Sequence, residues 1–168
     1  MTISMYQASV PVFVRALTNL SDVLKKGEAH AKEKGVEPDN LLQQRLMFDM
    51  LPLIKQIQIA CDTSARGAAR LAGAEPQSFP DTEKTLAEAH DRIERTIAYI
   101  KTFKSSQIDG CEERAIVVKM RNNEVHFTGQ DYLFGYALPN LFFHCTTAYD
   151  ILRVAGTQIG KMDYLGNR

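Results

Sequence analysis

The chain has 168 residues and a formal net charge of zero, with 20 basic and 20 acidic side chains. A chain of this length fits one domain that buries about two thirds of its unfolded surface and needs no disulfide bonds, so we predict a single domain over residues 1–168. Because the charges are spread along the chain without a basic stripe, we do not expect direct binding to nucleic acid.

The sequence favours a cytoplasmic location without membrane contact. The first residues lack the basic region and the apolar run of a signal peptide, and no apolar stretch is long enough to span a bilayer. The three cysteines are odd in number and widely spaced, which suits a reducing compartment better than a disulfide or zinc framework.

Helical periodicity divides the first two thirds of the chain into three segments. Residues 4–34 and 39–73 carry apolar side chains three and four positions apart. A helix over residues 39–73 would be about 50 Å long, with an interruption at Pro52, which cannot donate a backbone hydrogen bond. The third segment begins at Asp81, because aspartate is a good helix cap.

The periodicity changes between residues 113 and 128. Residues 115–120 are rich in β-branched side chains, residues 121–124 are typical of a turn, and residues 125–127 alternate between apolar and polar. We therefore predict a short β-hairpin over about residues 113–128. Because two strands are only marginally stable alone, this hairpin should lean on the helices.

A fourth helical segment follows the hairpin and carries the best candidate site. Thr128 and Asp131 have the spacing of a capping box, which predicts that this helix begins there. Pro139 should bend or widen the helix, because it lacks a backbone N–H. Asn140 and His144 lie one turn apart on the apolar face, so both are predicted to point into the bundle.

Two interpretations of this pair remain open. Buried polar groups must be hydrogen bonded or used, so the pair could line a polar pocket. Alternatively, His144 is a neutral core histidine that Asn140 or a tyrosine holds by a hydrogen bond.

Four further polar residues are candidates for the same pocket. Asp62 is equally consistent with a buried acid near the pair and with a residue that faces water or another helix. Gln58 follows a second glutamine two positions earlier, and at most one of the two should face inward. The remaining candidates are Asp49 and Tyr149, of which the latter precedes a tail over residues 156–168 that should pack across a bundle end or onto a partner.

Seven motifs spread over nearly the whole chain carry a family resemblance. They are YQASVPVF (residues 6–13), QIQIACD (56–62), SFPDTE (78–83), FTGQDY (127–132), LPN (138–140), TTAYDILR (146–153) and GKMDYLG (160–166). In these motifs the chain resembles an uncharacterised bacterial family within the DinB-like superfamily. The resemblance implies an all-α fold, an up-down-up-down four-helix bundle with the hairpin between its third and fourth helices. It also implies a homodimer, a state that is common among the relatives.

The better-known relatives hold a divalent metal through three histidines, two of them four residues apart on the last helix and one on the second. On this sequence the paired positions are Asn140 and His144, and no histidine lies near Gln58 or Asp62. An asparagine amide is a poor ligand for zinc or nickel. We therefore expect no metal cofactor, with a weakly held zinc or nickel ion at His144 and Asp62 as the alternative.

Two functional classes follow from these observations. The first is a metal-free protein whose polar pocket around Asn140 and His144 binds a small molecule or serves a dimeric interaction. The alternative is a divergent metal-dependent or thiol-dependent transferase or isomerase, as the resemblance implies, with His144 as the candidate catalytic residue. The missing histidines favour the first class, in which the protein is not an enzyme.

Overall fold

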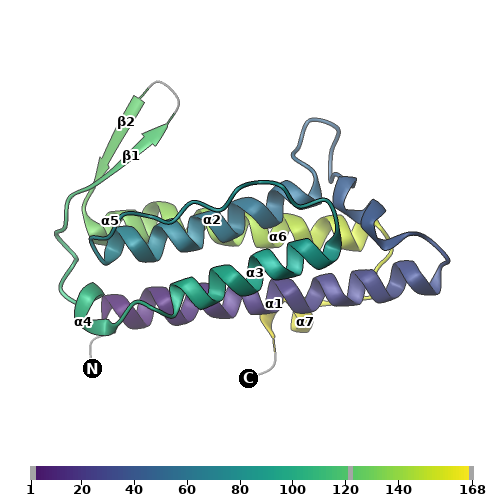
Figure 1. The fold of residues 1–168 in the computed structure, drawn as a ribbon, viewed down its shortest axis with the longest axis horizontal. Coiled ribbons are helices and arrows are strands. Elements are labelled where there is room, and N and C mark those ends of the chain that lie inside the picture. The colour runs from purple at the N-terminus through teal and green to yellow at the C-terminus, as the bar shows by residue number, and fades with distance from the viewer. Residues whose placement is uncertain (1–2, 121–122, 167–168) are drawn as a thin grey trace.

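The computed structural model describes residues 3–120 and 123–166, and this part of the chain is mostly helical. Four long helices in it lie side by side (Figure 1). They are α1 (Met5–Glu33), α2 (Leu53–Leu71), α3 (Leu86–Ile100) and α6 (Leu138–Val154). Among the described residues, no helix has both the length and the apolar character that crossing a membrane requires.

The second helix is shorter than its periodicity predicts. The segment expected to be helical forms a 3-10 helix, η1 (Pro38–Gln43), then a largely exposed loop over residues 44–52, and only then α2. The 19 residues of α2 extend about 28 Å rather than about 50 Å. Pro52 explains the difference, because proline disfavours helical backbone at the residue before it and cannot donate to the preceding turn.

The third helix also begins later than predicted. Thr85 accepts a hydrogen bond from the backbone N–H of Glu88 (3.2 Å), and the Glu88 carboxylate accepts one from the backbone N–H of Thr85 (3.1 Å). This capping box satisfies two backbone donors at once, so the helix begins at Leu86 and not at Asp81.

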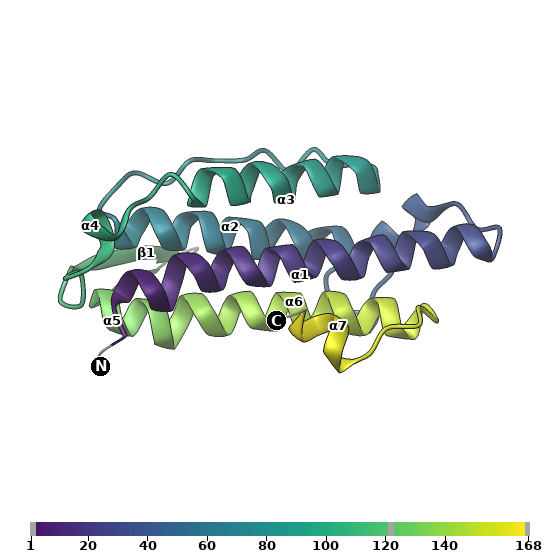
Figure 2. The ribbon, with the colours of Figure 1, turned by 90° about the horizontal axis from the view of Figure 1, so that it is seen from below.

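The directions of the helices differ from the predicted up-down-up-down order. α1 and α6 run one way along the bundle, and α2 and α3 run the other way (Figures 1 and 2). The backbone N–H of Tyr6, at the start of α1, donates to Asp109 beyond the end of α3 (2.8 Å), and that of Leu86 donates to Asp39 beyond the end of α1 (2.7 Å). The order is up-down-down-up because residues 72–85 return along the bundle before α3 begins.

A buried ion cluster holds this returning segment in place. The side chain of Arg92 on α3 is fully buried, and we call its group with Asp62, Asp81 and Glu83 the Arg92 cluster. The Arg92 guanidinium lies 2.7 Å from Asp62, 3.1 Å from Asp81 and 3.0 Å from Glu83, and it donates to the carbonyl of Pro80 (3.0 Å). The cluster therefore ties α2, the returning segment and α3 together.

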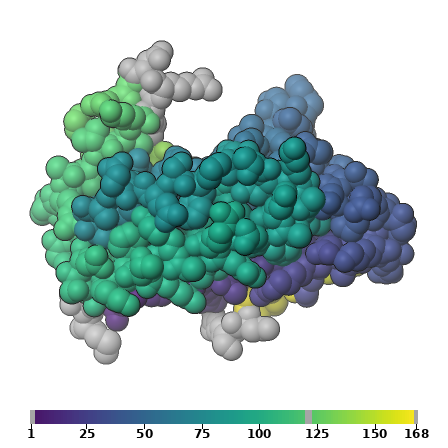
Figure 3. All heavy atoms as spheres, in the orientation of Figure 1, coloured from purple at the N-terminus to yellow at the C-terminus, as the bar shows by residue number. Residues whose placement is uncertain are grey.

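The predicted hairpin is confirmed as β1 (Ile116–Met120) and β2 (Asn123–Phe127), an antiparallel pair in which Val118 lies opposite Val125. Residues 121–122, in the predicted turn, lie outside the described residues. The hairpin projects from one end of the bundle, on the same side as the loop over residues 44–52 (Figure 3). The remaining short helices are α4 (Ser105–Ile108), α5 (Gly129–Tyr132) and α7 (Lys161–Leu165).

The fourth helical segment begins and widens as the sequence predicts. The Thr128 side chain accepts a hydrogen bond from the backbone N–H of Asp131 (3.2 Å) and caps α5, which is one of the two hydrogen bonds of the predicted capping box. Between α5 and α6 the chain makes a π-helical turn, η2 (Leu133–Ala137), immediately before Pro139. Because proline removes one backbone donor and crowds the preceding turn, a wider turn at this point accommodates it.

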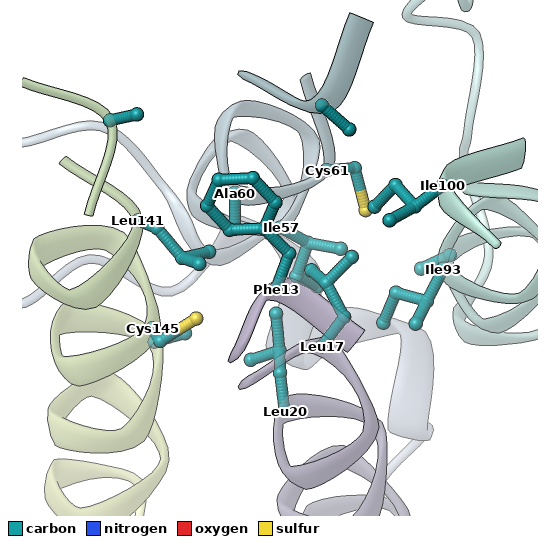
Figure 4. Packing of buried hydrophobic residues seen from close by; sticks show 14 of the residues in the cluster. Phe13, Leu17, Leu20, Ile57, Ala60, Cys61, Ile93, Ile100, Leu141 and Cys145 are labelled. Carbon is teal, nitrogen blue, oxygen red and sulfur yellow. The ribbon is translucent and has the colours of Figure 1, made fainter. Parts of the chain in front are cut away.

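One apolar core joins the four long helices (Figure 4). Phe13, Ile57, Ile93 and Leu141 come from α1, α2, α3 and α6 respectively, and all are fully buried. Gly67 on α2 allows the Phe13 ring to approach closely, because a Cβ atom there would lie 3.0 Å from its Cζ atom. The seam between α2 and α6, one side of this core, carries the candidate site.

Candidate functional site

Asn140 and His144 both face α2, but they meet different partners. The side-chain amide of Asn140 donates to the hydroxyl of Thr63 (2.9 Å). The Nδ1 atom of His144 lies 2.7 Å from Oε1 of Gln56. Thr63 and Gln56 lie about two turns apart on α2, and because α2 and α6 are antiparallel, each pair cross-links the two helices at a different level of the shared seam.

The partners of His144 define its chemical state. The amide nitrogen of Gln56 donates to the carbonyl of Leu51 (2.9 Å), so the amide oxygen is the atom that faces the imidazole. His144 therefore donates from Nδ1 and carries a lone pair on Nε2. Burial lowers the pKa of His144, which keeps the ring neutral at pH 7. His144 is only 8% exposed, and the ring of Phe143 packs against it edge-on.

Asn140 lines a polar cavity of about 180 Å³ that we call the α2–hairpin pocket. It lies between α2, strand β1 and the helical segment from α5 to α6. Its lining residues are Ile59, Asp62, Thr63, Arg66, Arg70, Val118, Lys119, Tyr132, Tyr136 and Asn140. His144 is not part of this lining, so the structure separates the two members of the predicted pair.

Asp62 joins the pocket to the Arg92 cluster. One carboxylate oxygen accepts from Arg92 (2.7 Å), and the other accepts from Arg66 (2.8 Å). Burial raises the pKa of Asp62, and the two guanidinium groups oppose this rise without cancelling it. Both oxygens are thus engaged by arginine, which leaves Asp62 poorly placed to bind a metal ion.

The other predicted pocket residues lie elsewhere. Gln58 is buried and donates to Glu83 (2.7 Å) at the edge of the Arg92 cluster, and because Gln56 is buried as well, the prediction that at most one of them faces inward was wrong. Asp49 is exposed in the loop before α2. Tyr149 is half-buried, and its ring packs edge-on against that of Tyr164 in the C-terminal tail. Of the six predicted residues, only Asn140 and Asp62 meet at one cavity.

Several pocket residues that were not predicted have a periodic signal in the sequence. Asp62, Arg66 and Arg70 recur every four residues on α2 and therefore share one face of that helix. Tyr132 and Tyr136 repeat the spacing on the facing segment, and their rings stack with centroids 5.8 Å apart. Lys119 gave no such signal, because the hairpin brings it to the pocket from a distant part of the chain.

The donor set at the seam does not fit the three-histidine site of the better-known relatives. His144 is held by Gln56 through Nδ1, Asp62 is bonded to two arginines, and the second paired position is the Asn140 amide. Zinc and nickel favour imidazole, thiolate or free carboxylate ligands. Over residues 3–120 and 123–166, no three histidine, cysteine or acidic side chains come close enough to hold an ion.

The thiols of Cys61 and Cys145, which are buried in the core, are not activated nucleophiles. Burial raises the pKa of both Cys61 and Cys145 to about 12, so neither forms a thiolate near neutral pH. Both side chains point into the core (Figure 4). They act as small apolar residues, Cys61 where α2 packs against α3 and Cys145 on the inner face of α6 (Figure 4).

Comparison with known proteins identifies the family. Residues 5–165 match the family described as Domain of unknown function (DUF1993), and the chain belongs to it. The chain is also similar to a crystal structure of a DinB family member protein from Shewanella denitrificans, with 39% identity and a TM-score of 0.88. That similarity covers 97% of this chain and 92% of the other. No curated protein matches the sequence. The expected DinB-like relationship is therefore confirmed.

Proposed function

We propose that this protein is a metal-free, cytoplasmic binding protein that holds a small molecule in the α2–hairpin pocket. The observation that supports the proposal is the convergence of Asn140, Thr63 and Asp62 on one cavity of about 180 Å³. Binding sites combine a cavity with a few fixed polar groups that orient the ligand. Asn140 retains an amide oxygen and a second N–H after it donates to Thr63, so it can both accept from a ligand and donate to it.

A panel of neutral, cationic and anionic compounds of metabolite size would test this proposal by saturation-transfer NMR. We expect at least one compound to bind the wild-type protein and not Asn140→Leu, because the substitution removes the central polar contact. Asn40→Leu is the matched control, since Asn40 is exposed and lies outside the pocket. A panel in which no compound shows binding that depends on Asn140 would reject the proposal.

The alternative function is a divergent transferase or isomerase in which His144 acts as a general base. Its supporting observation is the neutral imidazole, whose tautomer Gln56 fixes with the lone pair on Nε2. A base must also reach the proton that it removes. Because His144 is 8% exposed and lies outside the α2–hairpin pocket, binding is the better supported of the two functions.

The metal-free part of the proposal has its own test. Elemental analysis of protein purified without a histidine tag should find far less zinc or nickel than one ion per chain. This expectation rests on the donors present, since Asn140 replaces a histidine and two arginines occupy Asp62. A stoichiometric metal that is lost in His144→Ala would favour the metal-dependent alternative instead.

We also propose that two copies of the chain associate through a groove between α1, α6 and α7. The groove has a volume of about 500 Å³ and is lined mainly by apolar side chains that include Val12, Ala16 and the 41% exposed Phe142. Exposed apolar surface of this kind is typical of protein contacts.

Light scattering should give twice the 18.9 kDa chain mass, and Phe142→Lys should give the monomer. Phe48→Lys, outside the groove, is the control, and a monomeric wild type would reject the dimer.

A further inference from the structure

The α2–hairpin pocket has an excess of positive charge in a chain whose net charge is zero. Three basic side chains, Arg66, Arg70 and Lys119, line it beside a single carboxylate, Asp62. Asp62 already accepts hydrogen bonds from Arg66 on one side and from Arg92 behind the pocket. The lone acid of the lining is therefore neutralised within the protein, which, within the described part of the chain, leaves the charge of Arg70 unpaired and that of Lys119 paired only at 3.8 Å with the exposed Glu124.

Arg70 is positioned without a carboxylate partner. Its guanidinium donates to the hydroxyl of Tyr132 (3.1 Å) and lies 5.6 Å from the centre of that ring. Among the described residues, no acidic side chain lies within 4.0 Å of it. Arginine presents up to five N–H donors in a planar fork that matches the oxygens of a carboxylate or phosphate. A guanidinium held by neutral contacts keeps most of these donors for a ligand.

Lys119 approaches the same cavity from strand β1. Its ammonium group is 3.8 Å from Glu124 across the hairpin, and its side chain is 85% exposed. An exposed pair at that distance contributes little, so Lys119 can turn toward an anion at small cost. The hairpin thus supplies a second, exposed cation to the cavity that the guanidinium of Arg70 also lines.

The uncharged groups of the pocket are also oriented as donors. The Tyr132 hydroxyl accepts from Arg70, and the Thr63 hydroxyl accepts from Asn140. A hydroxyl that accepts in this way directs its own proton to another acceptor. Tyr136 adds a further hydroxyl to the lining. The pocket therefore combines several O–H and N–H donors with the one amide oxygen that Asn140 retains as an acceptor.

From this arrangement we propose that the ligand of the α2–hairpin pocket is a small organic anion whose carboxylate or phosphate oxygens bind Lys119 and the Arg70 guanidinium, which the buried Tyr132 hydroxyl holds in place. The inference rests on the proposed binding function and specifies its ligand class. A cavity of about 180 Å³ has the space of about six water molecules, which suits a small acid or phosphate rather than a nucleotide.

Backbone amide NMR titrations test the proposal with sodium phosphate, sodium succinate and the neutral analogue succinamide, against sodium chloride at matched ionic strength. We expect saturable shifts at Arg70 and Tyr132 with one or both anions and none with succinamide or chloride. Saturation by phosphate alone would assign a phosphate ligand, and saturation by succinate alone a carboxylate. Equal responses to the anions and to chloride would overturn the proposal.

Two substitutions locate the binding. Arg70→Met should weaken anion binding by about tenfold or more, because a charged hydrogen-bonding group is lost. Lys119→Met should also weaken it, and this variant should fold normally because the Lys119 side chain is exposed on β1. Arg95→Met and Lys101→Met, exposed residues of the α3 region, are the matched controls. Unchanged binding in both Arg70→Met and Lys119→Met would overturn the assignment.

The ligand class and the binding function can fail separately. If neutral or cationic compounds bind in a manner that depends on Asn140 while both anions do not, the ligand class is wrong and the binding function stands. If no compound binds in that manner, the binding function itself is rejected.

Discussion

The two sides of α2 differ in how their charged side chains are compensated. Toward α3, the guanidinium of Arg92 is completely buried and is matched by the carboxylates of Asp62, Asp81 and Glu83. Toward α6 and the hairpin, Arg70 and Lys119 face a cavity whose lone acid is already neutralised. An uncompensated charge raises the free energy of the folded state strongly when it is buried and only slightly when it is exposed to water. The charges on the first side therefore stabilise the fold, and those on the second side can bind a ligand.

The electrostatics of Glu83 illustrate the first arrangement. Burial alone would raise the pKa of this carboxyl, but hydrogen bonds from Gln58 and Arg92 outweigh that effect and lower it. Glu83 is therefore ionised throughout the neutral range and compensates the buried guanidinium. The comparison predicts that disruption of the Arg92 cluster affects stability, whereas disruption of the pocket cations affects binding.

The largest expected effect is that of Arg92→Met. Removal of the guanidinium leaves Asp62 and Glu83 without their buried partner, which should lower the free energy of unfolding by about 3–5 kcal/mol. Chemical denaturation would measure the loss. Arg95→Met is the control, because Arg95 forms an exposed pair with Asp91 on the same helix. A loss below about 1 kcal/mol would show that the cluster does not hold the returning segment.

A smaller loss is expected where the α2–α6 seam is broken. His144→Leu leaves the amide oxygen of Gln56 buried without a donor, so stability should fall by about 1–3 kcal/mol. The double variant Gln56→Leu/His144→Leu should recover part of this loss, because both polar groups are then removed. If the double variant is as unstable as the sum of the single variants, the hydrogen bond does not couple the two helices.

The pH dependence of the unfolding free energy should include a contribution from His144. Burial lowers the pKa of His144 below the value of about 6.5 that it has in the unfolded chain. The unfolded state then binds more protons, so the stability from neutral His144 is complete above about pH 6.5 and is lost as the pH falls toward the folded pKa.

His144→Leu should therefore reduce the slope of unfolding free energy against pH between about pH 7 and pH 5, by at most about 1.4 kcal/mol per pH unit. The slope that remains includes His90, whose pKa burial also lowers. Denaturation curves at several pH values would measure the difference. An unchanged slope would mean that His144 is protonated equally in the folded and unfolded states.

The smallest effect on stability is expected from Lys119→Met. With its side chain 85% exposed, its removal should change the free energy of unfolding by less than about 0.5 kcal/mol while it weakens anion binding. The two predictions contrast Arg92 on α3, whose loss should affect stability, with Lys119 on β1, whose loss should affect ligand binding. A large loss of stability would place Lys119 on the structural side of the comparison.

Local signals predicted the elements whose causes lie within a few residues. The β-branched run before the hairpin, the Thr128 cap and the wider turn before Pro139 are all confirmed. Two local predictions were wrong because competing signals were stronger. Pro52 separates α2 from η1, and the Thr85 capping box delays α3.

The candidate site was predicted only in part, and the reason is geometric. The spacing of Asn140 and His144 placed both on the face toward α2, but their separate partners depend on how two antiparallel helices are aligned along the seam. The same alignment leaves Gln58 with the Arg92 cluster and Tyr149 with the tail. Contacts between helices depend on how the helices pack, and residue spacing within one helix does not predict that packing.

The sequence by itself determined the helical class, the hairpin, the family and the inward face of Asn140 and His144 on α6, because periodicity, capping and turn chemistry act over short distances. Only the tertiary structure decided the direction of α3 and the composition of the pocket. The returning segment over residues 72–85 makes α3 run in the same direction as α2 (Figure 2). The folded hairpin brings Lys119 to the cavity that Arg70 lines. Both depend on contacts between residues far apart in the chain, where burial and charge balance of the whole bundle choose the arrangement.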